Sequence, residues 1–273
     1  MKLSRRNLVL GALLSAFVLT GCGKKEEAAN VQAPTTPAAE VKEYVVGTDA
    51  AYAPFEFEND QKQAEGFDID VVTAIADKAG IKVKFINTPW EGIFASLNNG
   101  DRDALVSAIT ITDERKASMD FSEPYFEARQ LIVVAKDAKV AKFGDLKGMK
   151  VAVQTGTTGD ELVQKLLGKT SADIKRFEST PLALKELESG GVQAVVADNG
   201  VVINYLKNNA DKGLISVEDK DSFHPEYYGV AVKKGNAELL GKINEGLKAI
   251  KADGTYDKIP PTGVGETTYP DHA

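Results

Sequence analysis

The 273-residue sequence contains one cysteine, one tryptophan and two histidines, and these scarcities exclude several kinds of protein. A single cysteine cannot form an intramolecular disulfide, so the hydrophobic core has to hold the fold. Histidine and cysteine show no zinc-binding spacing, and no Gly-Xaa-Ser-Xaa-Gly nucleophile motif occurs. The sequence therefore predicts neither a disulfide-stabilised scaffold nor a zinc or serine-nucleophile enzyme.

An excess of basic residues is absent as well. The chain has 33 Lys and Arg against 40 Asp and Glu, a formal net charge of −7. A nucleic-acid-binding domain normally carries a basic stripe, and this sequence has none. We therefore expect no nucleic-acid partner. The net charge does not argue against a small ligand, because a pocket can differ locally from the rest of the surface.

The N-terminal residues have the layout of a secretory signal peptide. Lys2, Arg5 and Arg6 precede an apolar run, residues 8–19, that is shorter than the roughly 20 residues of a membrane span. The run ends in Leu-Thr-Gly-Cys, which resembles the lipobox of bacterial lipoproteins. The resemblance implies cleavage before Cys22 and attachment of the mature chain to a membrane through a lipid on this cysteine.

The next residues, up to 42, are rich in Ala, Pro, Thr and charge, and they read as a flexible tether. From residue 43 onward, strand and helix patterns alternate, which is typical of an α/β fold with largely parallel sheets. The predicted strands are 44–49, 82–87, 103–110, 131–135, 150–156, 194–198 and 227–234. The predicted helices are 67–80, 92–100, 160 onward, 200–208 and 237–259, the last with a shorter helix at its end.

Residues 93–108 and 183–198 align without a gap, and each reads as a helix, a glycine stop, a turn and a buried strand. Leu97 matches Leu187, and Gly100 matches Gly190. Any two helix-turn-strand units look alike to some degree, so chance is one explanation. The other explanation is that the chain builds two α/β lobes of similar construction.

Five motifs then follow one another in the order of a known family. They are GTDAAYAPFEF (47–57), GFDIDVVTAIADKAG (66–80), SAITITDERKASMDFSEPYF (107–126), VAVQTGTTGD (151–160) and AVVADN (194–199). With them the chain resembles the periplasmic solute-binding proteins of polar amino-acid ABC importers, family 3, such as the glutamine-, histidine- and lysine-arginine-ornithine-binding proteins. The match runs from about residue 43 to residue 259, although no single motif would be specific.

The resemblance implies a type II periplasmic-binding-protein fold, in which two α/β lobes are joined by two crossing strands and the ligand lies in the cleft between them. The crossings are expected near 125–129 and 224–228. The expected order is signal peptide, tether, lobe 1, lobe 2, the rest of lobe 1 and an irregular tail, at residues 1–21, 22–42, 43–128, 129–225, 226–260 and 261–273.

A free L-amino acid brings a carboxylate and an ammonium, and each is costly to remove from water unless it meets partners. A guanidinium suits the carboxylate, because it can donate two parallel hydrogen bonds. Arg115 follows a predicted strand end, where ligands collect in open α/β sheets. The local pattern alone indicates a solvated residue, but the resemblance implies the carboxylate clamp. The rest of the charged run, residues 113, 114 and 116, is expected at the surface or in helix capping.

For the ammonium, the resemblance implies Asp198 as the acceptor, helped by Thr110 and by a carbonyl of Ser107 or Ala108. Asp198 ends a predicted buried strand, so its side chain could instead cap the following helix, or do both. Ala108 stands where Gly or Ser is frequent in the family. The difference has no consequence if only the backbone contacts the ligand.

The glycine- and threonine-rich turn at 154–160 opens a helix, and its amides suit a carboxylate. The hydroxyl of Thr157 or Thr158 can add a hydrogen bond. Gln154 occupies a position that varies with the ligand in the family, so it is expected near the ligand side chain.

By the same resemblance, Tyr52 and Trp90 lie on either side of the ligand side chain, and Asp49 meets its distal end. Trp90 could equally pack in the core. An acid near two aromatic rings suits a cation and disfavours an acidic ligand. We therefore expect arginine or lysine as the ligand, with glutamine as the alternative within the family.

An enzyme is the alternative class, because a few proteins of this fold are dehydratases. Catalysis needs a general acid or base with a tuned pKa. His224 lies near the predicted return crossing and His272 in the tail, while Glu56 and Glu58 read as charges at a strand edge. We expect a non-enzymatic binding protein without cofactor or metal, held outside the cytoplasm by its lipid, that delivers its amino acid to a membrane permease and its ATPase.

Overall fold

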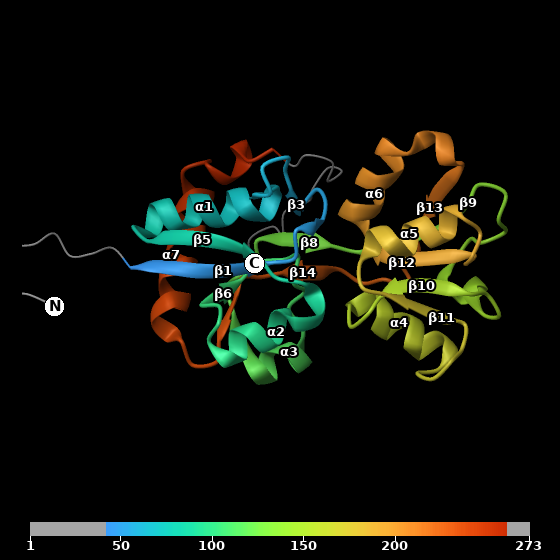
Figure 1. Cartoon of the computed structure of the whole chain (residues 1–273), viewed down its shortest axis with the longest axis horizontal. Helices are drawn as coiled ribbons and strands as arrows, with labels where there is room; N and C mark the ends of the chain where they lie inside the picture. The colour runs from blue at the N-terminus through green and yellow to red at the C-terminus, as the bar shows by residue number, and fades with distance from the viewer. Residues whose placement is uncertain (1–41, 261–273) are drawn as a thin grey trace, which may run out of the picture. The chain divides into compact units, whose positions relative to one another are not determined.

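The computed structural model describes residues 42–260. The predicted signal peptide, Cys22, the tether up to residue 41 and the C-terminal tail lie outside this range. Within it, the helices and strands form two lobes, each built on a five-stranded sheet (Figure 1).

The sheet of lobe 1 has the strand order β5-β1-β6-β15-β7. Its strand β1 (Glu43–Thr48) pairs in parallel with β5 (Lys82–Asn87) and β6 (Ala104–Leu105). Strand β15 (Ala231–Lys233) pairs antiparallel with β6 and with β7 (Met119–Phe121). The lobe also contains the helices α1 (Phe67–Ala79), α2 (Trp90–Asn99), α3 (Asp113–Ser118) and α7 (Ala237–Ala252), the 3-10 turn η3 (Tyr256–Lys258), and a small sheet of β2 (Ala51–Tyr52), β3 (Glu56–Glu58) and β4 (Ala64–Glu65).

The sheet of lobe 2 has the order β11-β10-β12-β9-β13. Its strands β11 (Ile174–Phe177), β10 (Val151–Gln154) and β12 (Ala194–Asp198) are parallel, and β9 (Gln130–Ala135) runs antiparallel to β12 and to β13 (Leu214–Val217). The helices are α4 (Thr158–Leu167), α5 (Thr180–Glu188) and α6 (Asn199–Asn208), with 3-10 turns η1 (Phe143–Leu146) and η2 (Ala210–Lys212).

The two sheets share one construction, and the aligned units of the sequence occupy matching places in it. The unit α2–β6 supplies the third strand of the first sheet, and α5–β12 supplies the third strand of the second. The similarity between residues 93–108 and 183–198 therefore reflects two lobes of similar construction.

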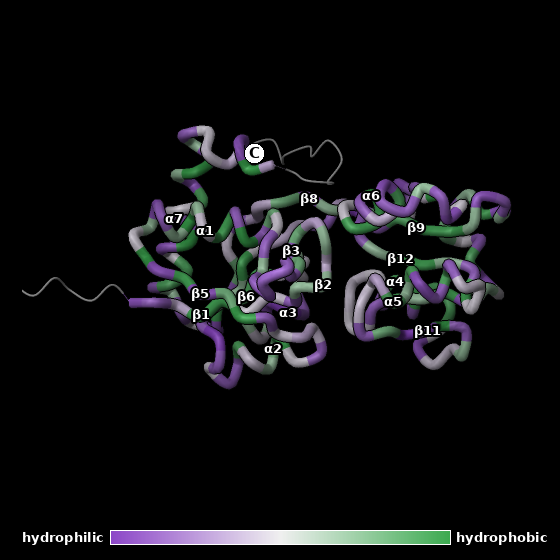
Figure 2. Tube along the Cα trace, turned by 45° about the horizontal axis from the view of Figure 1, so that its top comes forward, coloured by the Kyte–Doolittle hydropathy of each residue, from purple (hydrophilic) through white to green (hydrophobic). Residues whose placement is uncertain are grey.

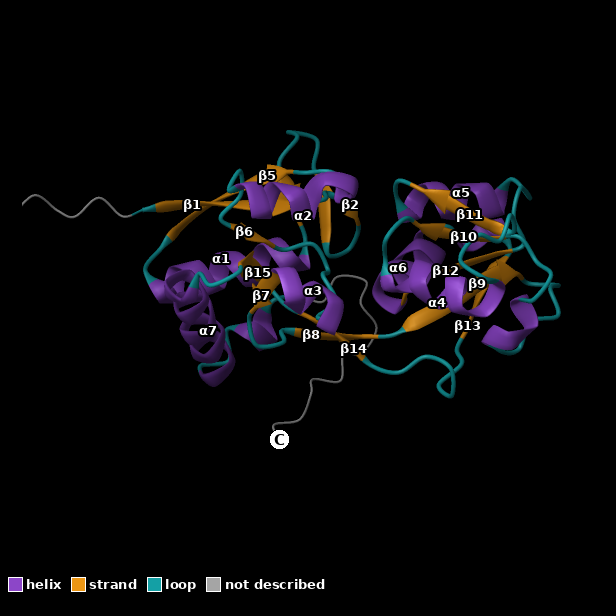
Figure 3. Cartoon of the chain, turned by 90° about the horizontal axis from the view of Figure 1, so that it is seen from below, coloured by secondary structure: helices purple, strands orange, loops and turns teal. Residues whose placement is uncertain are grey.

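Two short strands connect the lobes. Strand β8 (Phe126–Ala128) pairs antiparallel with β14 (Glu226–Tyr228), so that Phe126 lies opposite Tyr228. Figure 3 shows these strands side by side, between the strands of the first sheet and those of the second. The chain leaves lobe 1 through β8 and returns through β14, and this is the predicted two-lobed fold with two crossings.

Apolar residues gather in the strands, as the green colouring of β9 and β12 in Figure 2 shows, and helices such as α1 bury further apolar residues against the sheets. The core of lobe 1 includes a cluster of aromatic rings at the crossing. Phe55 packs edge-on against Phe126 and Tyr228, with ring centroids 5.0 and 5.3 Å apart. These contacts join the residue that precedes β3 to both crossing strands, so they fix the crossing against lobe 1.

Two predicted strands are wrong in their extent. The strand predicted at 103–110 ends at Leu105, because the N–H of Ala108 donates to the carboxylate of Asp68 (2.7 Å) and not to a neighbouring strand. The strand predicted at 227–234 is split into β14, which crosses between the lobes, and β15, which belongs to the first sheet. It breaks at Gly229, where a Cβ would lie 2.8 Å from the side chain of Ile111.

Helix starts also differ from the prediction, and α2 begins at Trp90, two residues before its predicted start. Helix α4 begins at Thr158, two residues early, because the hydroxyl of Thr157 accepts a hydrogen bond from the N–H of Asp160 (3.2 Å). The charged run 113–116 forms the short helix α3, which Thr112 caps in the same way. Within residues 42–260, no helix is both long enough and apolar enough to cross a membrane.

Candidate ligand-binding site

One pocket is lined by side chains from both lobes. It contains every residue predicted for the site, and Glu56 in addition. From lobe 1 come Asp49, Tyr52, Glu56, Trp90, Ser107, Ala108, Thr110 and Arg115, and from lobe 2 come Gln154, Thr157, Thr158 and Asp198. Segments far apart in the sequence thus meet at the carboxyl ends of β1, β10 and β12, where open α/β sheets bind ligands.

Arg115 is held in place by neutral partners. Its guanidinium donates to the carbonyl of Thr110 (2.9 Å) in lobe 1 and to the carbonyl of Gly156 (3.3 Å) in lobe 2. The guanidinium carbon lies 5.4 Å from the centroid of the Trp90 ring and 5.2 Å from that of Phe94. The half-buried Trp90 therefore packs against Arg115, and its indole N–H donates across the pocket to the carbonyl of Thr155 (3.1 Å).

Among the described residues, the guanidinium of Arg115 forms no ion pair with a carboxylate, and its hydrogen bonds go to the two carbonyls. A guanidinium has five donors and keeps its proton at any physiological pH. Two carbonyl contacts leave further donors free, and the charge itself is unmatched at close range. The site thus presents a fixed, planar cation that has no ion-pair partner among the described residues, although Glu161 and Asp198 act on its charge at longer range.

Asp198, buried at the end of β12, is surrounded by donors. Its carboxylate accepts hydrogen bonds from the hydroxyls of Tyr52 (2.9 Å) and Tyr228 (2.5 Å) and from the side-chain amide of Gln130. Burial nevertheless raises the pKa of Asp198 above its usual range. The side chain makes no capping bond to helix α6, so the capping alternative is wrong.

Asp49 lies just after β1 and is half-buried. Its N–H donates to the hydroxyl of Ser107 (3.0 Å). Burial raises the pKa of the Asp49 carboxyl, although hydrogen bonds from the Trp90 backbone and the Gln154 side chain act in the opposite direction. Gln154 is fixed in turn by Glu178, whose carbonyl accepts from its amide (3.1 Å), and by the hydroxyl of Thr180 (2.9 Å).

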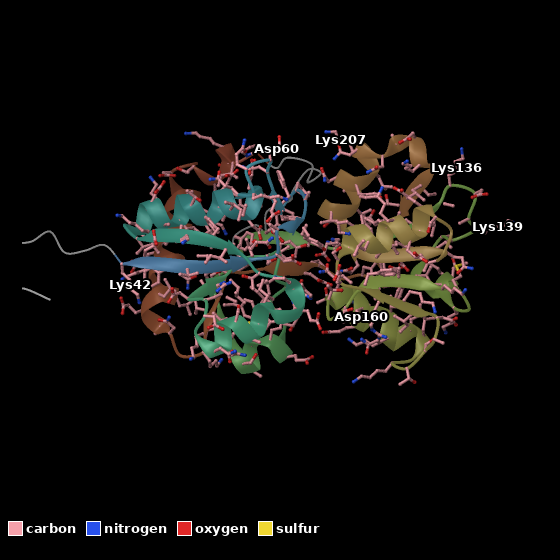
Figure 4. All side chains as sticks on the ribbon, viewed as in Figure 1. Lys42, Asp60, Lys136, Lys139, Asp160 and Lys207 are labelled. Carbon is pink, nitrogen blue, oxygen red and sulfur yellow. The ribbon has the colours of Figure 1, made fainter. Side chains whose placement is uncertain are left out.

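The turn before α4 is satisfied largely from within. The hydroxyl of Thr157 donates to the carbonyl of Gln154 (2.9 Å), and the N–H of Gly156 donates to the carboxylate of Asp160 (3.0 Å). Asp160, labelled in Figure 4, also pairs with Arg176 at 3.0 Å. The N–H of Gly156 is therefore already bonded to Asp160, and the predicted contact with a ligand carboxylate has to come from other N–H groups of the turn.

Sequence reasoning missed two residues behind the pocket wall, Glu226 and Gln130. Glu226, on the crossing strand β14, accepts from the hydroxyls of Thr110 (3.0 Å) and Thr158 (2.7 Å). Burial and the charge of Asp198 raise the pKa of Glu226 to about 7. Gln130, 1% exposed, donates to Glu226 as well as to Asp198. No local pattern marks either residue, because tertiary structure alone brings them here.

Glu56 corrects another prediction. It was expected as a charge at a strand edge, like Glu58, but its side chain is fully buried. Glu58 is exposed, as expected, and it pairs with Lys62. The two glutamates are two positions apart and share one face of the strand, so the burial of Glu56 comes from the packing around the start of β3 and not from strand alternation. His224 is exposed and does not line the pocket.

The part of the chain that the structure describes contains no group of three His, Cys, Asp or Glu residues placed to hold a metal ion. A fixed cation, a caged carboxylate and a second carboxylate after β1 can recognise a small molecule that carries both charges.

Comparison with known proteins gives one consistent picture. Residues 44–261 match the model of the family "Bacterial extracellular solute-binding proteins, family 3". The chain is 46% identical over 247 residues to a protein of Neisseria gonorrhoeae named "Probable histidine-binding protein", covering 90% of each chain. It is 33% identical to an L-arginine-binding protein of Pseudomonas aeruginosa, covering 78% of this chain and 85% of the relative.

A solved structure is similar over the same range. It is the arginine-, lysine-, histidine-binding protein ArtJ of Geobacillus stearothermophilus, which is 45% identical in sequence. The superposition has a TM-score of 0.79 and covers 83% of this chain and 97% of the other. These relatives carry the names of binding proteins and not of enzymes.

Proposed function

We propose that this chain, which belongs to the bacterial extracellular solute-binding proteins of family 3, binds a free basic L-amino acid. The family makes it the extracytoplasmic, non-enzymatic amino-acid-binding component of an ABC importer. The proposal concerns the finer points, which are the class of amino acid, the residues that bind it and the anchor.

The unpaired Arg115 carries the proposal. A ligand carboxylate can form the ion pair that residues 42–260 do not supply, with two parallel hydrogen bonds from the guanidinium. On the lobe 2 side, Asp198 is a buried carboxylate whose neighbours are neutral donors. A ligand ammonium supplies the cation that it lacks. Together the two residues match the two charges of an α-amino acid.

The charges of the pocket favour a basic side chain. Arg115 is the only cation among the described residues that line it. Asp49 and Asp198 are acids, and burial and the nearby Asp68 raise the pKa of Glu56 well above its usual range. The acids of the pocket outnumber its one cation, so a ligand with an extra positive charge suits it better than one with an extra negative charge. The relatives named above are binding proteins for histidine and arginine, in keeping with this choice.

The lobes contribute in sequence. We place the ligand first on lobe 1, against Arg115, Thr110 and the rings of Tyr52 and Trp90. Lobe 2 then adds Asp198 and the turn at 154–158. Ligand stabilises the closed state of the two lobes only through contacts that it makes in the closed state and does not make in the open state. The loaded protein would then dock on the permease of its importer.

The proposed anchor is a lipid on Cys22, which the Leu-Thr-Gly-Cys motif supports. Labelling cells with a radioactive fatty acid tests this, because the label should be lost in the variant Cys22→Ser. An unchanged label would argue against the anchor.

Calorimetric titration of the purified protein, freed of bound ligand, tests the function. We expect binding of L-arginine, L-lysine or L-histidine, and none of L-glutamate. Asp49→Asn removes the negative charge after β1 with little change of shape, so it should weaken a basic ligand more than L-glutamine. Binding of glutamine alone would overturn the substrate class, and binding of no amino acid would overturn the proposed function.

A further inference from the structure

Two carboxyl groups lie side by side beneath the lobe 1 wall of the pocket. Glu56 is the first residue of β3, and Asp68 is in the first turn of α1. Both side chains are 0% exposed. Asp68 does not line the pocket, and the binding model above uses neither group as a ligand contact.

Each carboxyl has one oxygen that accepts hydrogen bonds from the chain. Glu56 Oε1 accepts from the hydroxyl of Ser107 (3.0 Å). Asp68 Oδ2 accepts from the N–H of Ala108 (2.7 Å) and from the hydroxyl of Tyr125 (2.7 Å). No lysine or arginine of the described residues pairs with either group.

The other oxygen of each carboxyl, Glu56 Oε2 and Asp68 Oδ1, is buried without a donor. Two ionised carboxylates in such a place would be costly, because burial penalises charge and the like charges repel. One proton between the two unsatisfied oxygens removes one charge and gives both atoms a partner. The hydrogen bond between the two side chains raises the pKa of Glu56 and lowers that of Asp68.

Glu56 is the better holder of this proton. Asp68 already accepts from two donors, which stabilises its ionised form, whereas Glu56 accepts from one. In line with this, burial raises the pKa of Asp68 only to about 6, while burial and Asp68 raise that of Glu56 well above its usual range.

The pair holds the backbone that forms the pocket wall. Ala108 has φ of 45°, a left-handed conformation that is rare for a residue with a side chain, and its N–H is tied to Asp68. The hydroxyl of Ser107 donates to Glu56 and accepts from the N–H of Asp49 (3.0 Å). Three positions of the wall therefore depend on these two carboxyls.

We propose that Glu56 and Asp68 share one proton and act as a positioning pair that fixes Asp49, Ser107 and Ala108 for ligand binding. The effect on the ligand rests on the proposed function, whereas the shared proton does not. The titratable groups that face the pair are Asp49 after β1, Tyr52 on β2 and Tyr125 before β8. None of these supplies a positive charge that could replace the proton.

Amide substitutions test the sharing. Glu56→Gln places an N–H where the shared proton lies, so affinity should stay within about threefold of the unmodified protein. Asp68→Asn places the N–H on the other side chain and leaves Glu56 as the acceptor. This variant should lose more affinity than Glu56→Gln but should still bind the amino acid. In the double variant two NH₂ groups face each other, and affinity should fall by about tenfold beyond the sum of the single effects. Glu58→Gln, on the exposed neighbour, is the matched control.

Two measurements on the ligand-free protein separate this proposal from the proposed function. Infrared difference spectra should show the carbonyl stretch of a buried neutral carboxyl near pH 7, and Glu56→Gln should remove it. The double variant should also unfold at lower denaturant than the single effects predict. Absence of the band, or additive losses in the double variant, overturns the shared proton. If the band is present and no amino acid binds, the proton stands and the proposed function fails.

Discussion

A guanidinium beside two aromatic rings, with no carboxylate partner, is costly for a ligand-free protein to maintain. Arg115 is such a residue, and its hydrogen bonds go to backbone carbonyls. The cost makes sense if the missing anion arrives with the ligand. The burial of Arg115 is therefore better explained by binding than by stability.

Arg115→Ala should abolish amino-acid binding and change the free energy of unfolding of the ligand-free protein by about 1 kcal/mol or less. Arg115→Lys keeps the charge but loses the planar pair of donors, so affinity should fall by about tenfold to a hundredfold. Titration calorimetry and denaturant unfolding measure both effects. Arg102→Ala is the control, since Arg102 bonds to Thr88 away from the pocket. Wild-type affinity in Arg115→Ala would contradict the clamp.

The residues of the pocket were predictable from sequence where a motif marks them, as for Asp49, Arg115 and Asp198. Glu56, which lines the pocket, and Glu226, which lies behind its wall, were not predictable. The sequence around Glu56 alternates charge as an exposed edge strand does, and only the packing of β3 on α1 buries it. Glu226 is remote in sequence from Thr110 and Thr158, and no local pattern encodes a contact of that range.

Helices were predicted better than strands. Helix α1 was predicted almost to the residue, because its apolar spacing and the left-handed Gly80 that ends it are both local. The strand at 103–110 failed because Asp68, some forty residues away, draws the N–H of Ala108 out of the ladder. Periodicity indicates an element, but long-range hydrogen bonds set its end.

The crossing strand β14 carries a residue that touches both lobes. Glu226 accepts from Thr110 in lobe 1 and from Thr158 in lobe 2, so its carboxyl connects the lobes from behind the pocket. Both hydroxyls belong to the predicted binding site. Loss of this acceptor frees them and weakens the contact between the lobes.

We expect Glu226→Ala to lower the affinity for the amino acid by about tenfold, since two hydrogen bonds of ordinary strength are lost. X-ray scattering should show a larger mean radius at subsaturating ligand. Glu127→Ala is the matched control, because Glu127 lies on the partner strand β8 and pairs with Arg129. Equal affinities in the two variants would rule out a link through Glu226.

Buried carboxyls give the whole molecule an unusual response to pH. A carboxyl whose pKa is raised by folding binds more protons in the folded than in the unfolded chain between the two pKa values, so raising the pH through that window removes stability. The pKa is raised to about 6 for Asp68 and to about 7 for Glu226, and it is raised for Asp198 as well. Carboxyls with a lowered pKa, such as Asp253 beside Lys78, change the free energy of unfolding with pH only below about pH 4.

The free energy of unfolding of the ligand-free protein should therefore fall between about pH 5 and pH 8, by roughly 3 kcal/mol from Glu226 alone if its pKa moves from 4.5 to about 7. Denaturant unfolding at several pH values measures the slope. Glu226→Gln removes the titrating group and should flatten the profile in this window, whereas Glu127→Gln should leave it unchanged. A free energy of unfolding that rises from pH 5 to pH 8 would mean that the buried carboxyls are ionised in the folded chain. The protein would then neutralise the acids around the pocket by itself, without a cationic ligand.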